Sequence, residues 1–72
     1  MNPQRQAPTV RDLHRAYAAA ELRCMEARES METATSVHEV GRWQAVFTVE
    51  RRRMKDARHA WLVALERIGG AA

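Results

Sequence analysis

Between Thr9 and Ile68 the chain contains a single helix-breaking residue, Gly41. Both prolines stand in the first eight residues, and the other two glycines directly follow Ile68. Proline and glycine are the residues that most strongly interrupt a helix, and strands and loops normally bring many of them. A stretch this long with one glycine therefore predicts long α-helices.

Apolar residues recur at alternating spacings of three and four from the start of this stretch, over four heptads with no polar interruption. An average spacing of 3.5 residues is typical of two helices that wrap around each other with a left-handed twist. Thr9 with Asp12 matches an acidic variant of the helix N-terminal capping box. We therefore expect a first helix over about residues 9–34. The series is Val10, Leu13, Tyr17, Ala20, Cys24, Ala27, Met31 and Ala34.

A second series with the same spacing follows and predicts a helix over about residues 37–68. Residues 33–37 are mostly poor helix formers, and Ser36 with Glu39 matches a second capping box. These features favour a turn near residues 34–37, with a turn at Gly41 as the alternative. The series is Val40, Trp43, Phe47, Glu50, Met54, Ala57, Trp61, Ala64 and Ile68, in which only Glu50 is polar.

The two series fit each other when the chain is folded back on itself. Residues whose numbers sum to 74 then face each other over eight layers, and several layers set a small side chain against a large one, such as Leu13 against Trp61. The predicted fold is all-α, a two-helix antiparallel coiled-coil hairpin over residues 9–68. Residues 1–8 are expected to form a flexible N-terminal arm and residues 69–72 a flexible C-terminal tail.

A hairpin of this size has little interior. Below roughly 70–80 residues a single core rarely supplies more than ~3–5 kcal/mol, and small proteins add disulfides, a metal or a partner. Cys24 is the only cysteine, so no disulfide can form within the chain, and no metal-ligand spacing is present. We therefore expect either self-association into a homodimer, which would be a four-helix bundle, or binding to a protein partner.

Apolar residues outside the two series, which form the predicted seam between the helices, suggest where such association occurs. They are grouped rather than scattered, which is typical of a second buried surface. The sequence thus favours a small non-catalytic protein-protein interaction module, such as an adaptor, a chaperone-like factor or an inhibitor. The candidate partner-binding residues are Leu22 and Met25 on the first helix and Val46, Val49, Ala60 and Val63 on the second.

The alternative is a dimeric nucleic-acid-binding hairpin that uses a basic face of the second helix. The chain carries a formal net charge of +3, and Arg51, Lys55 and Arg58 share one helical face. Arg52 and Arg53 point away from that face, and the acidic residues Glu50 and Asp56 dilute the basic field.

Glu50 is the one carboxylate in the predicted seam, and Arg23 and Arg53 occupy flanking positions. A buried carboxylate is costly unless it is paired. The three residues are therefore either a structural polar layer that fixes register or a binding site. Cys24 is interpreted as a small core residue rather than a nucleophile. No catalytic triad, phosphate-binding loop or zinc pattern occurs, so we expect no enzyme activity, no cofactor and no small-molecule substrate.

The sequence also predicts the cellular compartment of the protein. The first eight residues lack the apolar centre of a signal peptide. The longest apolar run, residues 60–65, is far shorter than the ~20 residues that cross a bilayer. With a single thiol, these features favour a cytoplasmic protein that does not enter a membrane.

Overall fold

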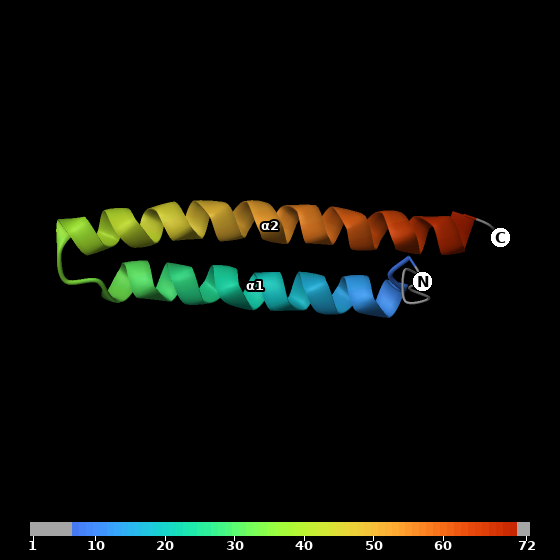
Figure 1. Ribbon diagram of the computed structural model, residues 1–72, viewed down its shortest axis with the longest axis horizontal. Coiled ribbons are helices and arrows are strands. Elements are labelled where there is room, and N and C mark those ends of the chain that lie inside the picture. The colour runs from blue at the N-terminus through green and yellow to red at the C-terminus, as the bar shows by residue number, and fades with distance from the viewer. Residues whose placement is uncertain (1–6, 71–72) are drawn as a thin grey trace, which may run out of the picture.

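The computed structural model describes residues 7–70, and these form two helices that run in opposite directions side by side. Helix α1 comprises Val10–Thr33, and helix α2 comprises Val37–Gly70. Figure 1 shows the turn at one end of the molecule and the start of α1 beside the end of α2 at the other. No strand occurs in the described residues. The predicted all-helical antiparallel hairpin is confirmed.

Helix α1 begins at the predicted capping box. The backbone amide of Asp12 donates to Oγ1 of Thr9 at 3.1 Å, and the amide of Thr9 donates to Oδ2 of Asp12 at 3.1 Å. Two of the amide groups that a helix start leaves unpaired are thereby satisfied. The Thr9 amide lowers the pKa of the Asp12 carboxyl below its ordinary value, and the charges of Arg15 and Arg11 act in the same direction.

Residues 34–36 form the turn, so the alternative turn at Gly41 is wrong. Ala34 leaves the helical conformation, with φ −63° and ψ 144°. Ser36 Oγ then accepts a hydrogen bond from the Glu39 amide at 3.1 Å and caps α2. The Glu39 carboxylate reaches back to the amide of Thr35 at 3.1 Å, one residue earlier than in a standard capping box. Gly41 lies inside the first turns of α2.

Burial follows the predicted seam over most of its length. All eight members of the first series are buried or half-buried, and so are the members of the second series from Trp43 to Ala64. Val40 and Ile68 differ, because they are 37% and 65% exposed. These two residues lie at the ends of the hairpin, where the longer α2 extends past the turns of α1.

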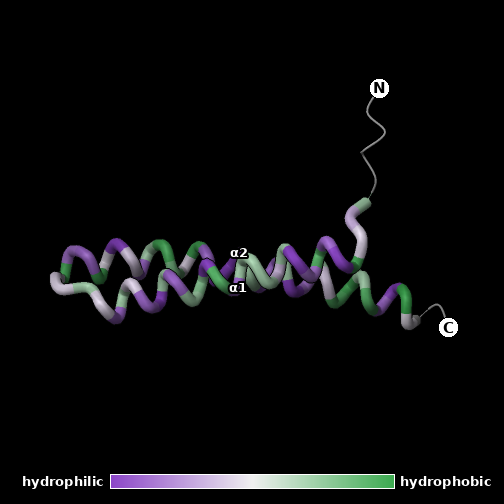
Figure 2. The backbone as a smooth tube through the Cα atoms, turned by 90° about the horizontal axis from the view of Figure 1, so that it is seen from below, coloured by the Kyte–Doolittle hydropathy of each residue, from purple (hydrophilic) through white to green (hydrophobic). Residues whose placement is uncertain are grey.

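Trp61 joins the helices near the open end of the hairpin, which is the end opposite the turn. Its ring stacks on Tyr17 at a centroid distance of 5.6 Å and lies 4.8 Å from the ring of His14. In the perpendicular view of Figure 2 the two helices cross near the middle of the molecule. This crossing is what a 3.5-residue apolar repeat imposes on paired helices.

The buried core of the hairpin is small. Only Ala20, Cys24, Ala27 and Glu50 are buried among the described residues. The accessible surface is 6153 Å² for a chain of 8.2 kDa. A compact monomer of that mass exposes about 4,500 Å². The single hairpin therefore leaves much more surface in water than a globular chain does.

The expected C-terminal tail is wrong for its first two residues, because α2 continues through Gly69 and Gly70. Glycine costs about 1 kcal/mol relative to alanine in a helix but does not forbid one. No glycine with a positive φ is found in the described part of the chain, so no left-handed residue ends α2 there. The flexibility expected of residues 1–6 and 71–72 lies outside the described residues. Ala7 and Pro8 precede α1 and are exposed.

Neither helix, over the residues that the structure describes, combines the length and the apolar character needed to cross a bilayer.

Replacing Gly41 by alanine is expected to stabilise the hairpin by about 0.5–1 kcal/mol. The glycine is helical, and a Cβ built on it meets no atom within 4 Å, so alanine restricts the unfolded chain without a clash. Urea unfolding followed by circular dichroism measures the change. Gly69→Ala, in the last turn of the same helix, is the matched control and should have a smaller effect. A loss of stability in Gly41→Ala would contradict a helical Gly41.

Candidate protein-interaction surface

A three-residue ion-pair cluster interrupts the apolar seam near its middle. Arg23 Nε on α1 donates to Glu50 Oε2 at 3.0 Å, and Arg53 Nη1 donates to Glu50 Oε1 at 3.0 Å. Glu50 is only 8% exposed. The side chains of Arg23 and Arg53 are 52% and 64% exposed. The pairing expected from the flanking positions is therefore present, and we call these three residues the polar layer.

The polar layer is a buried carboxylate that is paired on both oxygens. Both carboxylate oxygens of Glu50 accept hydrogen bonds, which offsets the cost of removing the charge from water. The two guanidinium groups remain partly in water, so the layer is buried on one side and hydrated on the other. The bond from Arg23 also ties α1 to α2 at one register. A shift of either helix by one residue would break the bond to Arg23 and leave Oε2 of the buried carboxylate without its partner, whereas Arg53, on the same helix as Glu50, would keep its bond to Oε1.

Four of the six predicted partner-binding residues lie on one side of α2, beside the polar layer. Val46 and Val49 line a shallow hollow with Glu50 and Arg53. Val46 also lines a neighbouring hollow with Ser30 of α1. Val46 is 38% exposed and Val49 is 50% exposed, so both are available to a partner.

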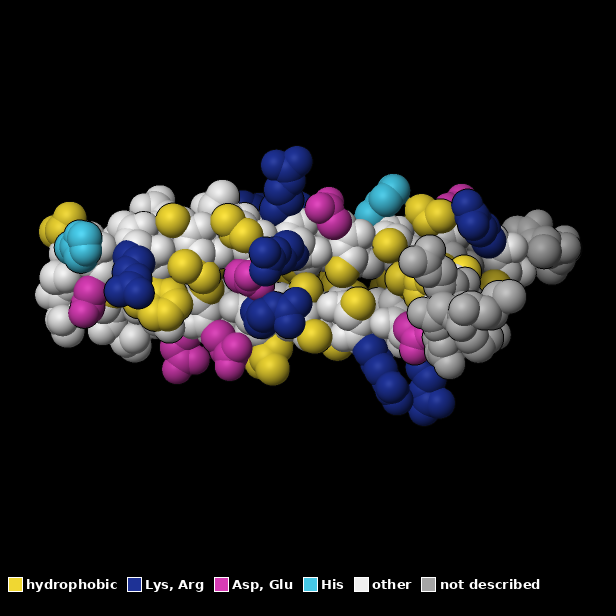
Figure 3. Space-filling view, in the orientation of Figure 1, with side chains coloured by type: hydrophobic (Ala, Val, Ile, Leu, Met, Phe, Trp, Pro, Cys, Tyr) yellow, Lys and Arg dark blue, Asp and Glu magenta, His cyan; other side chains and the backbone are white. Residues whose placement is uncertain are grey.

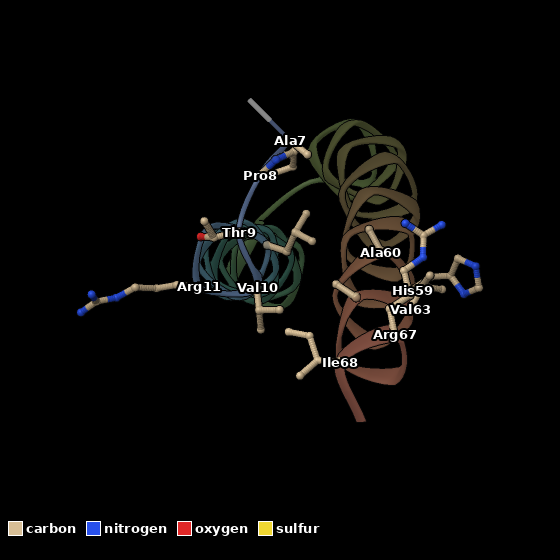
Figure 4. A pocket seen from close by; sticks show the side chains of 12 residues that line it. Ala7, Pro8, Thr9, Val10, Arg11, His59, Ala60, Val63, Arg67 and Ile68 are labelled. Atoms are coloured by element: carbon tan, nitrogen blue, oxygen red, sulfur yellow. The ribbon is translucent and has the colours of Figure 1, made fainter. Parts of the chain in front are cut away.

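Ala60 and Val63 lie on the same side of α2, toward the open end. They line a larger hollow of about 860 Å³ between the residues that precede α1 and the end of α2. Figure 4 shows Ala7 and Pro8 at one edge of this hollow, Val10 and Ile68 at another, and Arg11 pointing away from α2. We call Val46, Val49, Ala60 and Val63, with the hollows beside them, the α2 side face.

The hollows of the α2 side face lie on both sides of the polar layer along the hairpin. Figure 3 shows a face of the molecule on which apolar side chains follow the seam on either side of a central group of acidic and basic side chains. A surface of this kind combines apolar area with a few fixed charges. That combination is typical of protein interfaces, whose apolar centres are oriented by sparse polar contacts.

The other two predicted residues do not join the α2 side face. Met25 lines a hollow on the opposite side of the hairpin, with Cys24, Phe47 and Met54. Leu22 is 57% exposed and, by helical spacing, lies on the outward side of α1. The structure therefore divides the six residues into a group of four and a separate pair.

The predicted basic residues lie on the side of α2 away from Val46 and Val63. Arg51, Lys55 and Arg58 are all exposed. Arg51 lines the hollow that contains Met25, where Arg28 of α1 also contributes. None of the three basic side chains has an ion-pair partner within 4 Å in the described part of the chain.

Sequence reasoning missed Ser30, which lines the hollow next to Val46 and Trp43. It is polar and lies outside the apolar series, so hydrophobic periodicity could not select it. Its spacing could have done so, because Ser30 follows Arg23 by one heptad and therefore shares the side of α1 that carries the polar layer.

In the described residues no cluster of three or more histidine, cysteine or acidic side chains is arranged to hold a metal ion. No protein-family model matches the chain, and no curated protein or solved structure matches it at a significant level.

Removing both arginines of the polar layer should destabilise the hairpin far more than removing its acid. The double variant Arg23→Ala, Arg53→Ala leaves a buried carboxylate unpaired, at an expected cost of about 3 kcal/mol. Glu50→Met leaves two arginines that can turn into water and should change stability by less than about 1 kcal/mol. The double variant Arg28→Ala, Arg52→Ala at exposed positions is the control. Chemical denaturation measures the free energy of unfolding. If the Arg23→Ala, Arg53→Ala variant lost no more stability than the control, a structural role for the polar layer would be refuted.

Proposed function

We propose that this chain is a small non-catalytic protein-interaction module that acts through the α2 side face. The observation that carries the proposal is the contrast between its interior and this surface. The buried apolar residues are only Ala20, Cys24 and Ala27 in the described part of the chain. The larger side chains Val46, Val49 and Val63 stay partly in water along one side of α2. Covering them with a partner would supply the apolar burial that the single hairpin lacks.

The polar layer supports a role in specificity rather than in catalysis. Its carboxylate is engaged by two arginines, and the hollows beside it are shallow and open to water. A catalytic carboxylate would have to present a free oxygen to a substrate in an enclosed site. A partner that covers the α2 side face must instead satisfy the exposed parts of Arg23 and Arg53, which penalises partners without matching acceptors.

Val63→Asp should leave both helices folded and weaken association by at least about tenfold, because it places a charge in the apolar part of the α2 side face. Leu22→Asp, on the outward side of α1, should have a smaller effect. Circular dichroism checks helicity, and sedimentation equilibrium with capture of partners from the native host measures association. If neither variant changes mass or capture, the α2 side face is not the interaction surface.

A second candidate function is nucleic-acid binding through Arg51, Lys55 and Arg58. Its support is that these side chains are exposed, lack ion-pair partners within 4 Å in the described residues, and lie away from the α2 side face. A protein partner on that face would therefore leave them free to contact phosphates.

If the basic side chains bind phosphates, affinity for a mixed RNA and DNA pool should fall steeply with salt, by about 0.9 log units per log unit of salt for each contact on duplex DNA. Arg51→Ala should reduce that slope by about one, whereas Arg42→Ala, on another side of α2, should not. Gel-shift titrations at several salt concentrations measure the slope. Absence of any shift at low salt would remove this candidate.

A further inference from the structure

A second set of residues on α2 repeats with the 3-4 spacing of a helix stripe, on the side that carries the α2 side face. Its members share one side of the helix because successive spacings of four and three residues keep returning to the same direction. It includes the four apolar residues already described and places charged residues at its centre and ends. We call it the α2 stripe: Arg42, Val46, Val49, Arg53, Asp56, Ala60, Val63 and Arg67.

The α2 stripe is nearly a palindrome. Residues whose numbers sum to 109 match in an antiparallel alignment of the stripe with itself. Val46 then faces Val63 and Val49 faces Ala60, so apolar meets apolar on both sides of the centre. At the centre Arg53 faces Asp56, so opposite charges meet twice.

We propose that the occupant of the α2 side face is a second copy of this chain, with the two α2 helices antiparallel in this register. The inference rests on the proposed function and names its partner. A two-fold symmetric interface brings the same patch of both copies together, and such a patch must be complementary to itself. The α2 stripe meets that requirement in both its apolar and its central charged positions.

The central charges select the antiparallel arrangement. In a parallel pair Arg53 would face Arg53 and Asp56 would face Asp56, which is repulsive. Asp56 has no ion-pair partner within 4 Å in the described part of its own chain. The Arg53 side chain is 64% exposed and uses Nη1 for Glu50. A guanidinium has five donors, so Arg53 can hold Glu50 and also bind Asp56 of a second copy.

The ends of the α2 stripe carry like charges, since Arg42 would face Arg67. These ends are at the rim, where water and salt screen the repulsion. The apolar and central positions, which lose contact with water, decide the balance. Rim charges of one sign also limit how far the register can slip, because a shift brings them toward the apolar positions.

The area of the face is sufficient for a stable dimer. From Arg42 to Arg67 the stripe is about 38 Å long at 1.5 Å per residue. The α2 stripe alone is about 10 Å wide. When α1 of each copy also takes part, the layer is about 20 Å wide and covers roughly 800 Å² per copy. That is the usual area per partner in a specific complex. It is also within the surface that the hairpin exposes beyond that of a compact chain.

Cysteine cross-linking tests the register directly. In a Cys24→Ala background, Val46→Cys chains are mixed with Val63→Cys chains and oxidised. A disulfide needs Cα atoms about 4.4–6.8 Å apart, and position 46 faces position 63 of the second copy in the proposed register. Two copies of position 46 are 17 residues apart along the axis, about 26 Å, and cannot be bridged.

The mixture should therefore give the 46–63 disulfide, identified by mass spectrometry, in large excess over 46–46 and 63–63. Predominant 46–46 product would show a parallel dimer and overturn the proposal. So would failure to form any cross-linked dimer in chains that retain their helicity.

A charge reversal tests the centre of the interface independently. Asp56→Arg places four arginines together and should weaken dimerisation by at least about tenfold, because like charges across an interface are strongly unfavourable. Glu66→Arg makes the same change on another side of α2 and should leave the dimer intact. Sedimentation equilibrium measures both, and equal effects would reject the central pairing.

The outcomes separate the proposed occupant from the proposed function. If the purified chain is a monomer but Val63→Asp abolishes capture of another protein, the α2 side face is an interaction surface and the second copy is rejected as its occupant. If the chain dimerises and Val63→Asp leaves both mass and capture unchanged, the α2 side face itself is rejected.

Discussion

The arrangement of this hairpin depends on how the buried carboxylate of Glu50 is paired. The apolar seam alone would tolerate neighbouring registers, because its most buried residues are small and similar, as Ala20 and Ala27 are. The bond from Arg23 of α1 to Glu50 of α2 restricts that freedom, since a shifted helix would leave one oxygen of the buried carboxylate without its cross-helix partner. Polar residues at seam positions of coiled coils are known to specify register in this way. The layers on either side, including the stack of Trp61 on Tyr17, then follow from one cross-helix contact.

The same contact links the interior to the surface. Glu50 is buried, whereas the arginines that hold it stay more than half exposed. The two arginines that pair with the buried carboxylate are therefore exposed on the side of the hairpin where Val46 and Val49 are exposed. A partner at this surface would meet side chains already held in place by the fold, and such preorganisation lowers the entropy lost on binding.

Periodicity predicted the fold well because the physics of a hairpin is local and repetitive. The spacing from Val10 to Ala34 identified the buried side of α1, and the capping box at Thr9 fixed its start. The position of the turn stayed ambiguous in the sequence because Gly41 and Ser36 both suit a helix boundary. The hydrogen bonds of Glu39, which place the boundary at Ser36, are visible only in the structure. Surface grouping was harder to predict. Leu22 and Met25 are apolar like Val46, but which side of a two-helix rod each occupies depends on the partner helix, and so the structure divides them.

The three-residue turn has a consequence for how the molecule opens. The Thr35 amide donates to the Glu39 carboxylate and ties the turn to the start of α2. Only three residues separate the helices, so little entropy is lost on closing the loop. At the other end the helices are joined only by side chains, around the hollow lined by Val10 and Val63. Transient separation of the helices should therefore begin at the chain ends and spread toward the turn. Amide hydrogens near Ala27 would then exchange with solvent more slowly than those near Leu13.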